Sequence, residues 1–120
     1  MDQDSYRYCK IFVDGAEIDG VKAALAGVFS GSFERHTMYV GQGLAVEVRG
    51  NSDADDAEDN DDFLYWPVVV ELDVEGEVVP GVVVDTTKSI LNTLWDAGRR
   101  AVAACDFEAE LPWNGGIERP

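Results

Sequence analysis

Seven carboxylates fall within ten residues of this chain, and they are the side chains whose type and spacing most suggest chemistry. Carboxylate oxygens suit calcium and magnesium. An EF-hand loop, however, needs alternating ligands, a central glycine and a terminal glutamate, and this segment lacks that spacing and any glycine. We therefore expect no metal site, and an exposed acidic loop over residues 50–62. The seven residues are Asp53, Asp55, Asp56, Glu58, Asp59, Asp61 and Asp62.

Other reactive residue types are present without the pattern that catalysis requires. His36 is the only histidine of the chain, and a Ser-His or Cys-His site needs a nucleophile within hydrogen-bond reach of its base. Asp106, Glu108 and Glu110 could do paired acid–base work, but nothing in the sequence indicates the required separation. We expect no catalytic residue, no cofactor and a non-enzymatic protein.

The charge balance restricts the partners. The chain holds 24 acidic and 9 basic residues, for a net charge of −15. Nonspecific nucleic-acid binding depends on lysine and arginine, and a negative field repels anionic membranes. We expect a basic protein partner, no nucleic acid, no membrane, and a monomer or weak homodimer. The acidic run from Asp53 to Asp62 would steer the encounter, and Tyr65 and Trp113 would anchor it.

Length and apolar content favour one globular domain over residues 1–120. The start of the chain lacks the basic and apolar parts of a secretory signal. The longest apolar runs, at 66–70 and 82–84, are too short for a bilayer. Cys9 and Cys105 form no CxxC motif, which fits reduced thiols. These features predict a soluble, cytoplasmic protein.

The elements that must position these residues follow from periodicity and turn signals. Residues 35–40 and 44–49 favour extended structure, and Gly41 and Gly43 between them permit either a hairpin or one bent strand with a bulge. Asp19 is the expected cap of the first helix, and Asp85, Thr86 or Thr87 that of the second. The sequence predicts strands over 6–13, 63–74 and 99–107. It predicts one helix over 18–29 and a second helix that runs from its cap at 85–87 to Gly98. The tail over 108–120 is expected to be irregular and to be held in place by Trp113.

The order β-α-β-β-α-β is that of an α+β, ferredoxin-like sandwich with two helices on one face of an antiparallel sheet. Its first and last strands are neighbours, so Cys9 and Cys105 should lie close together without a disulfide. The open face would carry Tyr6, Tyr8, Phe12, Phe63 and Tyr65. A dimer partner, the hairpin at Gly41 or a bound protein would cover that face.

The resemblance of this chain to a known group of proteins rests on two segments, residues 63–67 (FLYWP) and 104–112 (ACDFEAELP). In the layout of residues 6–112 the chain resembles small acidic bacterial immunity proteins of polymorphic or contact-dependent toxin systems. The resemblance implies an inhibitor that masks the active site of a basic toxin, often a nuclease, and it transfers no site residues. The alternative is a small-molecule-binding or regulatory ferredoxin-like domain that dimerises through its open sheet face.

Overall fold

The computed structural model describes residues 3–41, 43–52, 54 and 62–120 of the chain. Within these residues, 3₁₀ turns η1 (Gln3–Tyr6), η3 (Phe63–Tyr65), η4 (Glu108–Glu110) and η5 (Pro112–Gly116) flank the regular elements. Neither described helix has the length and apolar composition that a bilayer span requires. The regular elements are β1 (Tyr8–Asp14), α1 (Ile18–Phe29), β2 (Thr37–Val40), β3 (Leu44–Gly50), β4 (Val68–Val74), α2 (Pro80–Asp96) and β5 (Arg100–Ala104).

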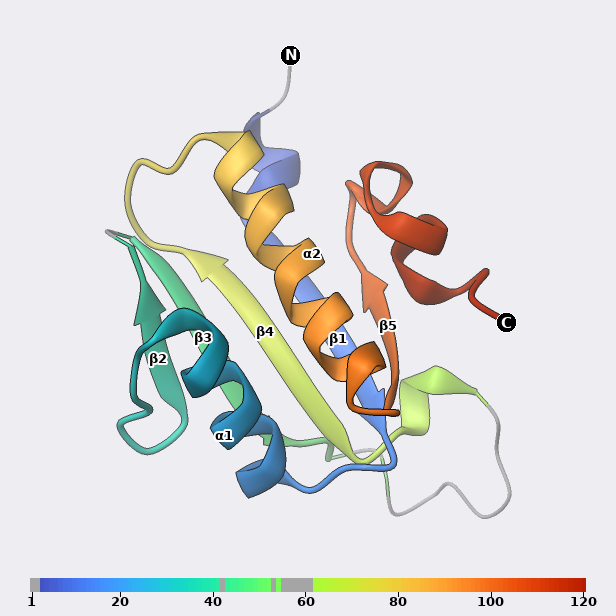
Figure 1. Cartoon of the computed structure of the whole chain (residues 1–120). Helices are drawn as coiled ribbons and strands as arrows, with labels where there is room; N and C mark the ends of the chain where they lie inside the picture. The colour runs from blue at the N-terminus through green and yellow to red at the C-terminus, as the bar shows by residue number, and fades with distance from the viewer. Residues whose placement is uncertain (1–2, 42, 53, 55–61) are drawn as a thin grey trace.

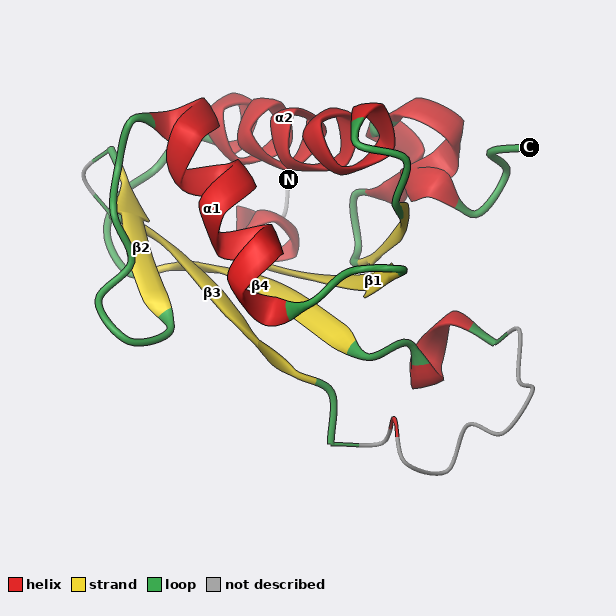
Figure 2. Ribbon diagram, turned by 60° about the horizontal axis from the view of Figure 1, so that its bottom comes forward, coloured by secondary structure: helices red, strands yellow, loops and turns green. Residues whose placement is uncertain are grey.

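The described strands form one antiparallel sheet in the order β2-β3-β4-β1-β5 (Figure 1). Both helices cover the same face of this sheet (Figure 2), so the α+β prediction is confirmed. The predicted four-stranded ferredoxin-like order is not, because β2 and β3 form a hairpin and add a strand at the edge. Gly41 and Gly43 permit this reversal with φ angles of +65° and +138°, which residues other than glycine rarely adopt.

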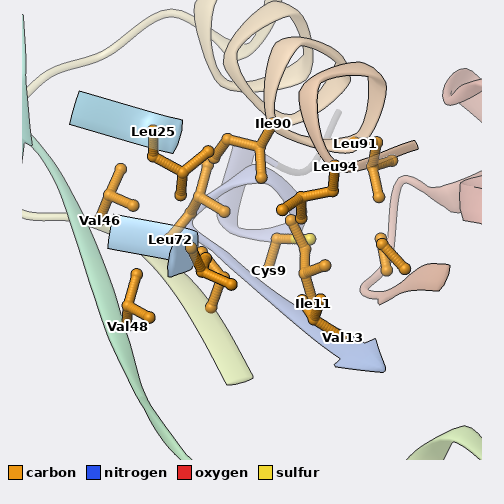
Figure 3. Packing of buried hydrophobic residues seen from close by; sticks show 14 of the residues in the cluster. Cys9, Ile11, Val13, Leu25, Val46, Val48, Leu72, Ile90, Leu91 and Leu94 are labelled. Atoms are coloured by element: carbon orange, nitrogen blue, oxygen red, sulfur yellow. The ribbon is translucent and has the colours of Figure 1, made fainter. Parts of the chain in front are cut away.

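The main core lies between the sheet and the two helices. Strand side chains alternate between faces, so every second residue of β1 and β4 points at the helices, as Figure 3 shows for Cys9, Ile11 and Val13. The helices contribute stripes spaced by three and four residues. These stripes are Val21 and Leu25 of α1 and Val83, Ile90, Leu91 and Leu94 of α2.

The first helix ends as its sequence predicts, and the second begins earlier than expected. Ser30 takes the left-handed conformation after α1, but Glu17, rather than Asp19, occupies the N-cap position. Helix α2 begins at Pro80, in the first-turn position that proline favours. Thr87 therefore lies inside the helix, where its buried hydroxyl donates a 2.8 Å hydrogen bond to the Val83 carbonyl oxygen. The predicted caps at residues 85–87 are wrong.

The predicted strand over residues 63–74 divides in two. Its first part is the turn η3, and β4 begins only at Val68, after Pro67. Asp62 caps η3, since its carboxylate accepts a 3.0 Å hydrogen bond from the Leu64 amide. The break places Trp66 on the face opposite the helices, away from Val68.

Tyr6 also departs from the predicted open face. It belongs to η1 rather than β1, and its ring stacks on Phe107 with the ring centroids 5.4 Å apart. Both rings pack against the core under the helices. Tyr6 therefore adds nothing to the open side of the sheet.

Candidate functional site

The sheet face opposite the helices has a covered half and an uncovered half. Over the covered half, η3 brings Phe63 and Trp66 onto Phe12, with 5.4 Å between the Phe12 and Phe63 ring centroids. Phe12 is only 5% exposed, and Val69 and Val102 complete this second apolar cluster. The chain itself therefore covers these aromatic residues, where we expected a dimer partner, the Gly41 hairpin or a bound protein.

The uncovered half is acidic, and strand register assembles it. Across the sheet, Tyr39, Ala45, Asp73 and Tyr8 pair in one row, and Glu47 pairs with Glu71 in the next. These side chains share one face because alternate residues of each strand do. They line a depression of about 280 Å³. We call this surface the acidic sheet face and define it as Tyr8, Tyr39, Glu47, Arg49, Glu71, Asp73 and Glu75.

The acidic sheet face holds four carboxylates and one guanidinium, a local charge of −3. Arg49 forms ion pairs with both Glu47 and Glu71, the two carboxylates that face each other across β3 and β4. Glu71 is the most enclosed of the three, with 13% of its side chain exposed. The unneutralised charge is therefore carried by the outer residues, Asp73 and Glu75, which are exposed.

Two tyrosines border these acids, and both stay protonated at neutral pH. Burial and the hydrogen bond that the Tyr8 hydroxyl donates to Glu71 raise the pKa of Tyr8. The negative charge of Glu75 raises the pKa of Tyr39. Tyr8 is 44% exposed and Tyr39 is 60% exposed. Exposed tyrosines held on strands are suitable anchors for a protein partner, because they bury large area at small entropic cost.

Of the seven acidic residues predicted to steer the partner, the structure describes one, Asp62. Asp53, Asp55, Asp56, Glu58, Asp59 and Asp61 lie outside the described residues. Asp62 is described, and it caps η3. Tyr65, the first predicted anchor, lies half-buried in the same turn.

Trp113, the second predicted anchor, is 51% exposed and belongs to η5, far along the chain. It has a left-handed backbone, with φ +56°, an unusual conformation for a bulky residue. With half of its surface exposed, Trp113 gives little support to the expectation that it holds the tail in place. Gly115 and Gly116 approach the backbone of β5 closely, at Ala103 and Ala101.

Most of the acidic sheet face could not be predicted from the sequence. Its one clear signal was alternation: Glu47 and Arg49 fall on the wet side of a strand whose other side is apolar. The same signal was available in β4, where Glu71 and Asp73 alternate with buried valine and leucine. Nothing local indicated that these strands would be neighbours.

His36, Glu108 and Glu110 have partners that do not form a catalytic site. His36 is exposed, and its Nδ1 lies 3.4 Å from the amino group of Lys22. Glu108 accepts a 2.9 Å hydrogen bond from the Cys105 amide, and Glu110 accepts one from the Tyr6 hydroxyl. Among the described residues, no group of three or more potential ligands could hold a metal ion.

Cys9 and Cys105 are both free thiols, and they share a hydrogen bond. This confirms the predicted close pair without a disulfide. The hydrogen bond to Cys105, together with burial, raises the pKa of Cys9. The same bond lowers the pKa of Cys105, because a thiolate there keeps the Cys9 proton as its donor. Cys105 is therefore the thiol of the pair that ionises first.

No protein-family model, no curated protein and no solved structure matches this chain. The acidic sheet face and its tyrosines are thus the main structural facts that bear on function. Their chemistry is that of a fixed array of hydrogen-bond acceptors with two aromatic donors beside it. Such an array suits binding of lysine and arginine side chains.

Proposed function

We propose that this chain is a non-enzymatic acidic binding protein, an immunity or inhibitor protein that neutralises a cognate basic toxin by masking its active site. The observation that supports it best is the acidic sheet face, on which carboxylates and exposed tyrosines lie together on rigid strands. The resemblance of the chain to small bacterial immunity proteins points the same way. Binding by complementary charge requires no catalytic group.

Charge acts on two scales in this proposal. The net charge of −15 attracts a basic domain from a distance, and such steering raises association rates from about 10⁵–10⁶ toward ~10⁸–10⁹ M⁻¹s⁻¹ at low salt. At contact, the exposed carboxylates of Asp73 and Glu75 can accept hydrogen bonds from arginine. Strand β4 fixes the backbone at Asp73, and Glu75 follows directly after its end, so little backbone entropy is lost when these bonds form.

The same surface disfavours the alternative, a regulatory or small-molecule-binding domain that dimerises through its open sheet face. Two copies meeting there would bring a charge of −3 against an identical charge. The apolar residue that such a dimer would bury, Phe12, is already covered within one chain. A monomer at micromolar concentration in sedimentation equilibrium supports the inhibitor, and a tight dimer supports the alternative.

The direct test uses the protein encoded next to this chain in its genome. Its C-terminal domain is expressed in a bacterial host with and without this chain. A domain that stops growth alone and permits growth in the presence of this chain supports the proposal. A neighbour that is harmless, or whose toxicity this chain does not reduce, contradicts it.

Paired charge variants then locate the binding surface. Asp73→Asn with Glu75→Gln removes two charges from the acidic sheet face, and Asp19→Asn with Asp85→Asn removes two from the exposed side of the helices. We expect the first pair to lower the association rate about tenfold at low salt, and the second to change it about twofold or less. Equal effects would show that only net charge matters.

A further inference from the structure

A second hollow lies at the other edge of the sheet. There the C-terminal tail runs beside β5 (Figure 1). Its volume is about 300 Å³, at the small end of the range for ligand sites. Its walls come from η3, β5, the end of α2 and the tail, and they include Phe63, Trp66, Trp95, Arg100 and Arg119. This hollow, which we call the tail cavity, is separate from the acidic sheet face.

The tail cavity concentrates cations on a chain that has few. Arg100 lies over the ring of Trp66, with Cζ 4.8 Å from the ring centroid, and Arg119 lies over Trp95 at 5.0 Å. Arg100 already forms an ion pair with Asp14. Arg119 has no ion-pair partner among the described residues. One guanidinium of the cavity therefore has its donors available.

One wall of the cavity is formed by a tryptophan whose buried N–H has no acceptor in the described part of the chain. Trp66 is 8% exposed, and its Nε1 has no hydrogen-bond partner within the described part of the chain. Trp95, on the other side of the cavity, donates its own Nε1–H to the Ala101 carbonyl oxygen at 3.1 Å. Buried polar groups in folded proteins are nearly always paired. The unpaired Nε1 is enclosed by protein atoms, so Trp66 offers its ring, rather than its N–H, to a molecule in the cavity.

We propose that the tail cavity binds a small planar organic anion, an aromatic carboxylate. The carboxylate accepts hydrogen bonds from Arg119, and the ring packs against Phe63 and the indoles. A guanidinium without an ion-pair partner in the described fold selects an anion over a cation or a neutral amide. Flat aromatic walls favour a flat body. This inference is independent of the proposed inhibitor function, which uses the opposite half of the sheet.

The test follows the three indole N–H resonances of the ¹⁵N-labelled protein during titration with indole-3-carboxylate and with benzoate. We expect saturable shifts of the Trp66 resonance, identified from a Trp66→Phe variant, with little change at the exposed Trp113. The uncharged probes, indole-3-carboxamide and benzamide, should bind at least about tenfold more weakly, because they lose the charge-assisted hydrogen bonds. Equal binding of acid and amide, or no saturable shift at Trp66, overturns the proposal.

A matched pair of variants separates the site from net charge. Arg119→Gln removes the available guanidinium near the end of the tail, where no ion pair of the described fold depends on it. Arg35→Gln makes the same charge change at an exposed residue outside the cavity. Indole-3-carboxylate should bind about tenfold more weakly to the first variant and unchanged to the second. An Arg119→Gln protein that binds like the wild type contradicts the assignment.

Discussion

Glu47 on β3 lies directly opposite Glu71 on β4, and the guanidinium of Arg49 contacts both carboxylates. Like charges in this position destabilise a pair of strands. Arg49 converts that repulsion into a network, and it does so from within the same strand as Glu47. Arg49 therefore links these two carboxylates, and Asp73 and Glu75 are the outward charges of the acidic sheet face.

Replacing Arg49 with methionine should destabilise the fold by about 0.5–1 kcal/mol at low salt. The value is modest because the Arg49 side chain is 48% exposed, and solvent screens such pairs. Urea unfolding measures the change. Adding Glu47→Gln to the variant should restore part of the loss, since the opposed charges are then gone. A double variant no more stable than Arg49→Met alone would show that repulsion is not the cause.

Tyr8 should make stability depend on alkaline pH. Its pKa is raised in the folded protein, so its contribution is complete below the unfolded value of about 10 and is lost as pH rises through the folded value. At pH 8, Tyr8→Phe should cost about 1–2 kcal/mol for the lost hydrogen bond to Glu71. Above pH 10 the difference between the two proteins should shrink. Urea unfolding at pH 8 and pH 11 tests this, and a constant difference would contradict it.

The hydrogen-bonded pair of Cys9 and Cys105 predicts which thiol is alkylated first. Cys105 is partly exposed and ionises first, whereas Cys9 is fully buried. Iodoacetamide should therefore alkylate Cys105 in the native protein, and Cys9 only after unfolding. Mass spectrometry of the peptides gives the site and rate. Cys9→Ala should slow alkylation of Cys105 at pH 8, because the thiolate loses its donor; an unchanged rate would count against the hydrogen bond.

Gly116 holds the tail against the sheet edge. A Cβ there would collide with the Ala101 carbonyl oxygen and lie 3.0 Å from the Trp95 ring, and its φ is +103°. Gly116→Ala should therefore destabilise the protein by about 1–3 kcal/mol. Gly27→Ala is the matched control, since its Cβ would meet nothing within 4 Å and it lies in α1. The control should stabilise by about 0.5–1 kcal/mol. Thermal unfolding compares the two.

Helix α1 and strand β1 could be predicted because their signals are local. The apolar stripe of residues 18–29 has helical spacing, and Ser30 ends it. The start of α2 could not, because the valines at 82–84 fit a strand or a helix equally well. Burial of Val83 and Val84 against the sheet decides between them. The predicted strand over 63–74 was wrong in its first part for a similar reason, since η3 interrupts an alternation that looked continuous.

By itself, the sequence determined the charge, the α+β class, the proximity of Cys9 and Cys105 and the absence of any recognisable catalytic motif. These depend on composition and on periodicities of a few residues. The tertiary structure alone decided that Glu47 meets Glu71 and that Trp66 and Arg119 share a cavity. The physical reason is that strand register and tail packing are set by burial of the whole core, which joins residues that no local pattern connects.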